Sequence, residues 1–180
     1  MILMQRDMWD YWGVADAVCI TTNGWVKSNG ENVMGAGCAG EAAKRFPGIA
    51  YHLGQAIRKN GHRVQIIPGT TIPFGTPSAL VSFPTKIVSL IPRSFADIGE
   101  QVLDRYKTQV KVGSNVPGWM CKSTLGMIRF SVEELRQLAD ENNWETLVLP
   151  LPGVNMGGLS KNSVLPIVET LDDRFVVVIK

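Results

Sequence analysis

The 180-residue sequence has few cysteines and few histidines, and these shortages exclude several kinds of site. Its three cysteines, Cys19, Cys38 and Cys121, are odd in number, widely spaced and free of any C-x-x-C pair. That pattern predicts neither a disulfide framework nor a zinc site, and no metal or cofactor is expected. Because His52 and His62 are the only histidines that could activate a thiol, Cys38 is predicted to be a small packing residue rather than a nucleophile.

Long apolar runs and a large net charge are also missing. No segment is apolar over the length needed to span a bilayer, and the start of the chain lacks the basic-then-apolar layout of a signal peptide. The formal net charge is only +2, so a broad basic face that grips nucleic acid is not expected. The prediction is a cytoplasmic protein without a membrane partner, which we expect to be a monomer.

The composition is otherwise that of a globular protein, with 45% hydrophobic and 19% charged residues. Apolar runs alternate with amphipathic helical patterns, which predicts an α/β fold. We expect a single domain over residues 1–180, a three-layer α/β/α sandwich with a mixed, largely parallel central sheet. The expected strands are residues 17–20, 64–67, 79–83, 146–149 and 175–179, and the expected helices are residues 41–46, 49–60, 95–106, 131–142 and 160–171.

Two regions carry more specific signals about where elements begin and end. Ser131 and Glu134 form the S-x-x-E pattern of a capping box, so a helix is predicted to begin with Ser131 as its N-cap. The segment 107–127 has glycines and a proline around a short apolar run, and it is predicted to be a loop excursion with room for one short strand.

A glycine-rich segment, MGAGCAG at residues 34–40, follows the first predicted strand and leads directly into a helix. Such a loop presents backbone N–H groups and the positive end of a helix dipole to an anion such as phosphate. The segment lacks both the Gly-Lys-Ser/Thr of a Walker loop and the full dinucleotide fingerprint. On this loop alone, a tight turn with close helix packing is an equally good interpretation.

A second glycine-rich segment, PLPGVNMGGL at residues 150–159, follows the strand predicted at 146–149. Two such loops can close on an extended diphosphate from both sides, and the pair is far more specific than either loop alone. Thr85 and Lys86 come just after another strand, where ligands of open α/β sheets gather, although a lone lysine there is often only a solvated charge. The sequence therefore predicts an anion-binding site at one edge of the sheet.

With both loops in view, the chain resembles the macrodomain family of ADP-ribose-binding modules. Within the family it is most similar to the branch of small DNA- and terminal-ADP-ribose glycohydrolases and ADP-ribose-1″-phosphate phosphatases. The resemblance covers nearly the whole chain, and the segment 107–127 is its least similar part. The motifs that carry it are RDM at residues 6–8, ITTN at 20–23, NVMGAGCA at 32–39 with KRFP at 44–47, FPTK at 83–86, and the second loop at 150–159.

The resemblance implies roles for individual residues. It implies that Asp7 binds the adenine amino group, that the two loops hold the diphosphate, and that Asn23, together with Asn32, addresses the distal ribose. Lys86 matches a lysine that attacks the distal ribose in the glycohydrolases, but Gly157 stands where those enzymes have an aspartate. Asn23 and Lys86 are the candidate catalytic residues. The implied ligand-binding residues are Asp7, Met8, Asn23, Asn32, Val33, Gly35, Ala36, Gly37, Cys38, Thr85, Gly153, Val154, Asn155, Met156, Gly157 and Gly158.

Two functions are compatible with these residues. The favoured one is binding of ADP-ribose or an ADP-ribose derivative, either free or carried by an ADP-ribosylated macromolecule. The alternative is a hydrolase that removes ADP-ribosyl groups or dephosphorylates ADP-ribose-1″-phosphate. The missing loop acid argues against a lysine and aspartate mechanism, because general acid–base catalysis contributes roughly 10²–10⁴ in rate. An interaction protein with a vacated pocket is least expected, since it would have no reason to keep the loop glycines.

Overall fold

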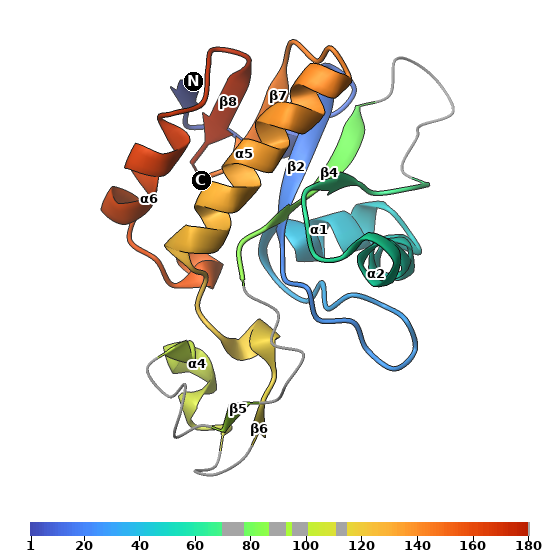
Figure 1. The fold of residues 1–180 in the computed structure, drawn as a ribbon, viewed down its shortest axis with the longest axis vertical. Coiled ribbons are helices and arrows are strands. Elements are labelled where there is room, and N and C mark those ends of the chain that lie inside the picture. The colour runs from blue at the N-terminus through green and yellow to red at the C-terminus, as the bar shows by residue number, and fades with distance from the viewer. Residues whose placement is uncertain (70–77, 87–92, 95–100, 111–114, 180) are drawn as a thin grey trace.

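The computed structural model describes residues 1–69, 78–86, 93–94, 101–110 and 115–179, and its centre is a sheet of order β1-β8-β7-β2-β4-β3 (Figure 1). The strand pairs in this sheet are parallel, except that β3 is antiparallel to β4. The predicted α/β fold with a mixed, largely parallel sheet is confirmed. The strands are β1 Ile2–Met4, β2 Ala17–Thr22, β3 Gln65–Ile66, β4 Ala79–Pro84, β7 Leu147–Pro150 and β8 Phe175–Val178.

The central strands are apolar on both faces because helices cover the sheet on both sides (Figure 1). Along β2, Ala17 and Cys19 contribute to one hydrophobic core, whereas Val18 and Ile20 contribute to the core on the opposite face. This alternation follows from the two-residue period of a strand. The helices are α1 Gly37–Arg45 and α2 Ile49–Asn60 on one face, with the 3-10 helix η1 Met8–Tyr11, and α5 Leu125–Glu141 and α6 Lys161–Val168 on the other.

Strand β1 is not among the predicted strands. It pairs with β8 in parallel, with Ile2 opposite Val176 and Met4 opposite Val178. The ammonium group of Met1 also donates a hydrogen bond to the Leu171 carbonyl at 2.9 Å. Three residues are too few to show a periodic pattern, so only the pairing with β8 defines this strand.

The predicted start of the fourth helix is wrong. Helix α5 begins at Leu125, and its N-cap is Thr124, whose hydroxyl accepts a hydrogen bond from the Met127 N–H. Ser131 lies in the middle of the helix, is fully buried, and donates from its hydroxyl to the Pro84 carbonyl at 2.7 Å. Ser131 is therefore a packing residue within α5, and the S-x-x-E pattern does not mark the start of a helix here.

The segment between β4 and α5 contains several short elements, and within the loop excursion predicted for residues 107–127 the described part has one short strand and one 3-10 helix before α5 begins. A short antiparallel pair joins β5 and β6, and Val102 and Val116 pack in a small core of their own. Of the helix predicted at 95–106, residues 95–100 lie outside the described part, and the helix seen here starts after an extended N-cap at Leu103. The elements are β5 Arg93–Ser94, α4 Asp104–Lys107, β6 Asn115–Val116 and the 3-10 helix η3 Gly118–Met120.

Candidate functional site

A cavity of about 550 Å³ opens at the carboxyl ends of the parallel strands. Its wall includes Thr22 at the end of β2, Thr85 just after β4, Pro150 at the end of β7 and Val178 at the end of β8. Ligands of open α/β sheets bind at this edge because the loops that follow the strands converge there. Both glycine-rich loops reach this same cavity.

The first loop ends at the N-terminus of helix α1. Its N-cap is Ala36, which has an extended backbone and no side chain that could accept the first N–H groups of the helix. Gly37 has φ +59°, and a Cβ built on it would lie 3.5 Å from Cγ of Met156 in the second loop. The uncapped N-terminus of α1 therefore faces the cavity with the second loop opposite it, an arrangement suited to an anion.

The second loop follows β7 and contains the 3-10 helix η4, Asn155–Gly157. Two residues of this loop have positive φ on the cavity side, Gly153 at +73° and Asn155 at +54°. A Cβ on Gly153 would lie only 2.7 Å from Cδ1 of Ile128, so glycine is required there by both backbone and packing. Gly158, at φ +77°, is not on the cavity wall, and a Cβ built on it would approach Leu103 and Lys122 instead.

Two carboxylates, those of Asp7 and Glu41, lie at one end of the cavity, and both accept hydrogen bonds from Trp9. Oδ1 of Asp7 accepts from the backbone N–H of Trp9 at 3.0 Å and caps η1. The indole N–H of Trp9 donates to Oε2 of Glu41 on α1 at 2.6 Å. Asp7 and Glu41 line the cavity with Arg6 and Met8, while Trp9 is buried in the core behind them. Glu41 is absent from the predicted ligand-binding residues, because a lone acid in an amphipathic helix carries no specific signal.

The two asparagines of the predicted site have different surroundings. Asn23 lines the cavity, and its side chain donates to the Val33 carbonyl at 2.8 Å and accepts from the Trp25 N–H at 3.1 Å. Asn32 is 1% exposed and lies behind the cavity wall, where its side-chain amide donates to the carbonyls of Asn23 and Trp25. In this arrangement Asn32 supports the segment that carries Asn23 rather than facing a ligand.

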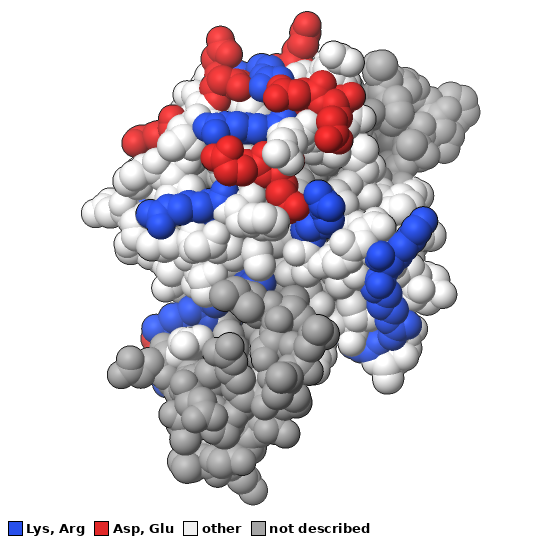
Figure 2. Space-filling view, viewed as in Figure 1, with Lys and Arg blue, Asp and Glu red and all other residues white. Residues whose placement is uncertain are grey.

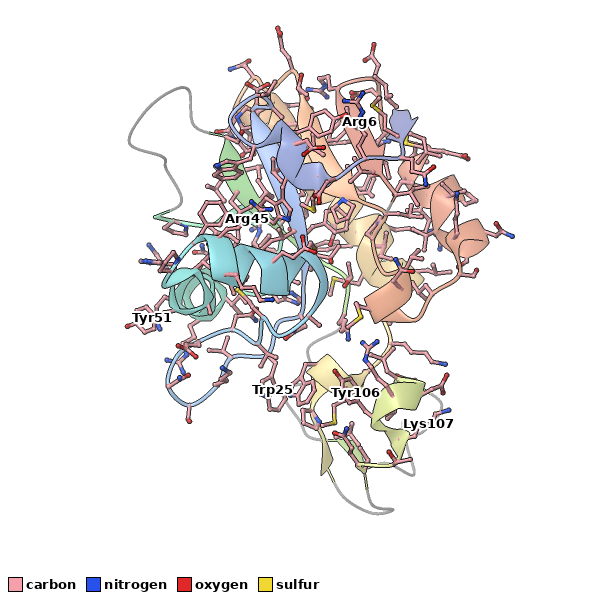
Figure 3. The ribbon with its side chains drawn as sticks, turned by 180° about the vertical axis from the view of Figure 1, so that it is seen from behind. Arg6, Trp25, Arg45, Tyr51, Tyr106 and Lys107 are labelled. Carbon is pink, nitrogen blue, oxygen red and sulfur yellow. The ribbon has the colours of Figure 1, made fainter. Side chains whose placement is uncertain are left out.

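The other end of the cavity is lined by residues of the segment between β4 and α5. Lys86 donates from Nζ to the Trp119 carbonyl at 2.9 Å, and the Trp119 ring contacts the Tyr106 ring edge-on at 5.2 Å between centroids. Arg105 donates to the Met156 carbonyl at 2.6 Å and so ties α4 to the second loop. Arg6 and Tyr106, both on the wall, lie toward opposite ends of the molecule in Figure 3, so the cavity is elongated.

Two titratable side chains on the cavity wall have shifted pKa values. Burial lowers the pKa of Lys86 to about 8, and the positive charge of Arg105 contributes to the shift. Burial raises the pKa of the Cys38 thiol, and its sulfur accepts from the backbone N–H of Thr21 at 3.2 Å. A raised pKa leaves Cys38 as an unreactive thiol, in keeping with a packing role.

The structure brings nearly all the predicted site residues to one cavity. The predicted residues on its wall are Asp7, Met8, Asn23, Val33, Gly35, Ala36, Gly37, Cys38, Thr85, Lys86, Gly153, Val154, Asn155, Met156 and Gly157, and those off the wall are Asn32 and Gly158. Sequence reasoning misses Arg105, Tyr106, Trp119 and Ser123. The first two lie in the helix predicted at residues 95–106 and the last two in the predicted loop excursion, and no motif at any of them points to a ligand. Within the described residues, no cluster of histidine, cysteine and carboxylate side chains could hold a metal ion.

The sequence matches no protein-family model and no curated protein. Solved structures, in contrast, are similar to this chain over nearly its whole length. The macrodomain of Mycobacterium tuberculosis DarG is similar with a TM-score of 0.65 and 20% identity, over 98% of this chain and 95% of that one. The macrodomain of Thermus aquaticus DarG is similar with a TM-score of 0.62 and 19% identity, over 99% of this chain and 97% of that one. At such identities the likeness establishes the fold, and the chain has the macrodomain fold.

A longer protein contains the same fold as one of its parts. Thermosipho africanus DarTG, solved in complex with ADP-ribose, is similar with a TM-score of 0.69 and 16% identity. The match covers 99% of this chain but only 41% of that protein.

Proposed function

We propose that this protein binds ADP-ribose or an ADP-ribose derivative in the elongated cavity. The observation that carries the proposal is the convergence of two backbone-rich loops on one cavity, with polar side chains at both of its ends. The N-terminus of α1 and the turn at η4 supply N–H groups that suit a diphosphate. The complex of Thermosipho africanus DarTG with ADP-ribose supports this choice of ligand, since that protein has the same fold.

The two ends of the cavity suit the two ends of such a ligand. The carboxylate of Asp7 is an acceptor for the amino group of adenine, the only strong donor on that base's edge. Asn23 and Lys86 place amide and amine groups near the other end, where the distal ribose would lie. A ligand of this length would contact both loops at once, which explains why glycine-rich segments follow two separate strands.

A hydrolase acting on an ADP-ribosyl bond is the second candidate, and the environment of Lys86 favours it. With a pKa of about 8, this amine is partly neutral near physiological pH, which is the form that can attack a ribose carbon. Gly157 offers no acid to assist, so a reaction here would depend on Lys86, Asn23 and groups of the substrate. Binding without turnover remains the simpler proposal.

The test is isothermal titration calorimetry with ADP-ribose, with AMP and ribose-5-phosphate as partial ligands, followed by chromatography of each mixture. We expect saturable binding of ADP-ribose that is tighter than that of either partial ligand. A further mixture with an ADP-ribosylated substrate is chromatographed in the same way, and new nucleotide products in it would favour the hydrolase. Absence of heat with all three compounds would overturn the proposal.

Asp7→Asn gives the matched variant for this experiment. Asparagine keeps one acceptor oxygen for the Trp9 N–H, so η1 stays capped, while the other carboxylate oxygen becomes a donor. Loss of a hydrogen bond to a charged group should weaken ADP-ribose binding about tenfold and leave ribose-5-phosphate unaffected. An equal loss for both compounds would contradict the assignment of Asp7 to adenine.

A further inference from the structure

Ser123 carries a buried hydroxyl that has no partner among the described residues. The residue lies just before the N-cap of α5, is 3% exposed, and belongs to the cavity wall. Its Oγ makes no hydrogen bond to any side chain or backbone group in the described part of the chain. Leaving a buried hydroxyl unsatisfied costs free energy, so native proteins retain such groups where a ligand or a water supplies the missing bond.

The backbone around Ser123 is fixed by two neighbours of the site. Its N–H donates to the Gly157 carbonyl at 2.8 Å, and the next N–H, of Thr124, donates to the Thr85 carbonyl at 3.0 Å. A Cβ built on Gly157 would lie 2.4 Å from Oγ of Ser123, so any side chain at position 157 would compete with the hydroxyl for one space. The hydroxyl therefore lies between the second loop and the Thr85 and Lys86 end of the cavity.

We propose that the Ser123 hydroxyl is a ligand-binding group that hydrogen-bonds the distal ribose of the bound nucleotide. This inference rests on the proposed function, because it assigns the part of ADP-ribose that Ser123 contacts. In the proposed function the backbone N–H groups of both loops serve the diphosphate, so a side-chain hydroxyl at the Thr85 and Lys86 end is available to the sugar. A hydroxyl both donates and accepts, which matches the hydroxyls of a ribose. Gly157 leaves the space that the hydroxyl itself occupies.

Helix α5 provides a matched control for this assignment. Ser131 is also buried and lies on the same helix, but its hydroxyl donates to the Pro84 carbonyl at 2.7 Å. Ser131→Ala removes this buried hydrogen bond, so it should lower the melting temperature. Ser123→Ala removes a hydroxyl that bonds none of the described residues, so the melting temperature should stay unchanged or rise.

The experiment compares ADP-ribose with ADP, which has the same adenosine and diphosphate but no distal ribose. Both compounds are titrated by calorimetry into the wild type, Ser123→Ala and Ser131→Ala, and the melting temperature of each protein is recorded. We expect Ser123→Ala to weaken ADP-ribose binding about fivefold, the effect of one hydrogen bond, with ADP affinity and melting temperature maintained. Ser131→Ala should melt earlier and keep the wild-type preference for ADP-ribose over ADP.

Three results would overturn the assignment of Ser123. Unchanged ADP-ribose affinity in Ser123→Ala would mean that the hydroxyl does not contact the ligand. An equal loss for ADP and ADP-ribose would place its bond on the diphosphate or adenosine. A lower melting temperature in Ser123→Ala would show that the hydroxyl has a structural partner. Failure of the wild type to bind ADP-ribose is seen before any variant is compared, so it identifies failure of the proposed function itself.

Discussion

Lys86 shows how far a side chain's chemistry depends on neighbours that are distant in sequence. Its position after β4 follows from the sequence, but its pKa of about 8 results from burial, with the amine bonded to the Trp119 carbonyl, and from the charge of Arg105. Trp119 lies in the predicted loop excursion, and Arg105 lies in a predicted helix that gives no signal of this contact. A sequence can therefore place a lysine at the edge of a sheet without indicating whether its amine is solvated or has a depressed pKa.

The depressed pKa of Lys86 predicts a particular pH dependence of stability. The unfolded chain should bind this proton up to a pKa near 10.5, whereas the folded protein releases it at about 8. Between these values the unfolded state binds more protons, so the free energy of unfolding rises with pH. We expect urea unfolding to show the wild type gaining stability relative to Lys86→Met as the pH increases through this window. A constant difference between the two proteins would mean that Lys86 keeps an ordinary pKa.

The two glycine-rich loops are alike in sequence but differ in what their glycines do. A Cβ on Gly35 would meet no atom within 4 Å, and the φ of Gly35 is not positive. Gly153 has φ +73° and is packed against Ile128 and Leu159. Under the proposed function the first glycine keeps space open for the ligand, whereas the second is needed by the fold. A sequence pattern cannot separate these roles, because both appear only as glycine.

Valine substitutions at the two loops should therefore have opposite effects. Gly35→Val should fold with the wild-type melting temperature and weaken ADP-ribose binding about tenfold or more, since the branched side chain enters the cavity. Gly153→Val should lose about 1–3 kcal/mol of stability from strain and overpacking. Thermal melting and calorimetry measure both effects.

Gly126 provides the control for this comparison. It too has open space around it, but it lies on α5 away from the cavity, so Gly126→Val should bind ADP-ribose normally. Wild-type affinity in a folded Gly35→Val variant would contradict the assignment of the first loop to the diphosphate.

At the scale of the whole molecule, the cavity is assembled from the beginning, middle and end of the chain. Arg6 comes from the segment after β1, Arg105 from α4 and Lys161 from the start of α6. On the face shown in Figure 2, the described charges are of both signs, with acidic side chains gathered near the end of α5. No helix in the described part of the chain is long and apolar enough to cross a bilayer.

The expectation of a monomeric single domain can be checked at this scale. Sedimentation equilibrium should give one species of 19.7 kDa, and thermal unfolding should show one cooperative transition that ADP-ribose moves upward. The upward shift follows from mass action, because the ligand binds the folded state alone. A concentration-dependent mass, or two transitions of which the ligand moves only one, would contradict the expectation.

The sequence by itself determined the parts of this protein that depend on local pattern. Periods of two and of about 3.6 residues located the main strands and helices, with strands found to within two residues of their observed ends, and glycine-rich runs marked both loops. These features can be predicted because the burial of side chains repeats with the period of the helix or strand over a short stretch of sequence. The six-residue strand β2 and the helix α2 are examples, since their apolar positions alone define them.

Only the tertiary structure decided which side chains face the cavity and which support it. The resemblance assigns both Asn23 and Asn32 to the distal ribose, yet Asn23 lines the cavity and Asn32 is buried behind it. Ser131 resembles a helix cap but packs against Pro84, while Ser123 gives no signal and lies on the cavity wall. The physical reason is that these roles are set by contacts between residues far apart in the chain, which no local period records.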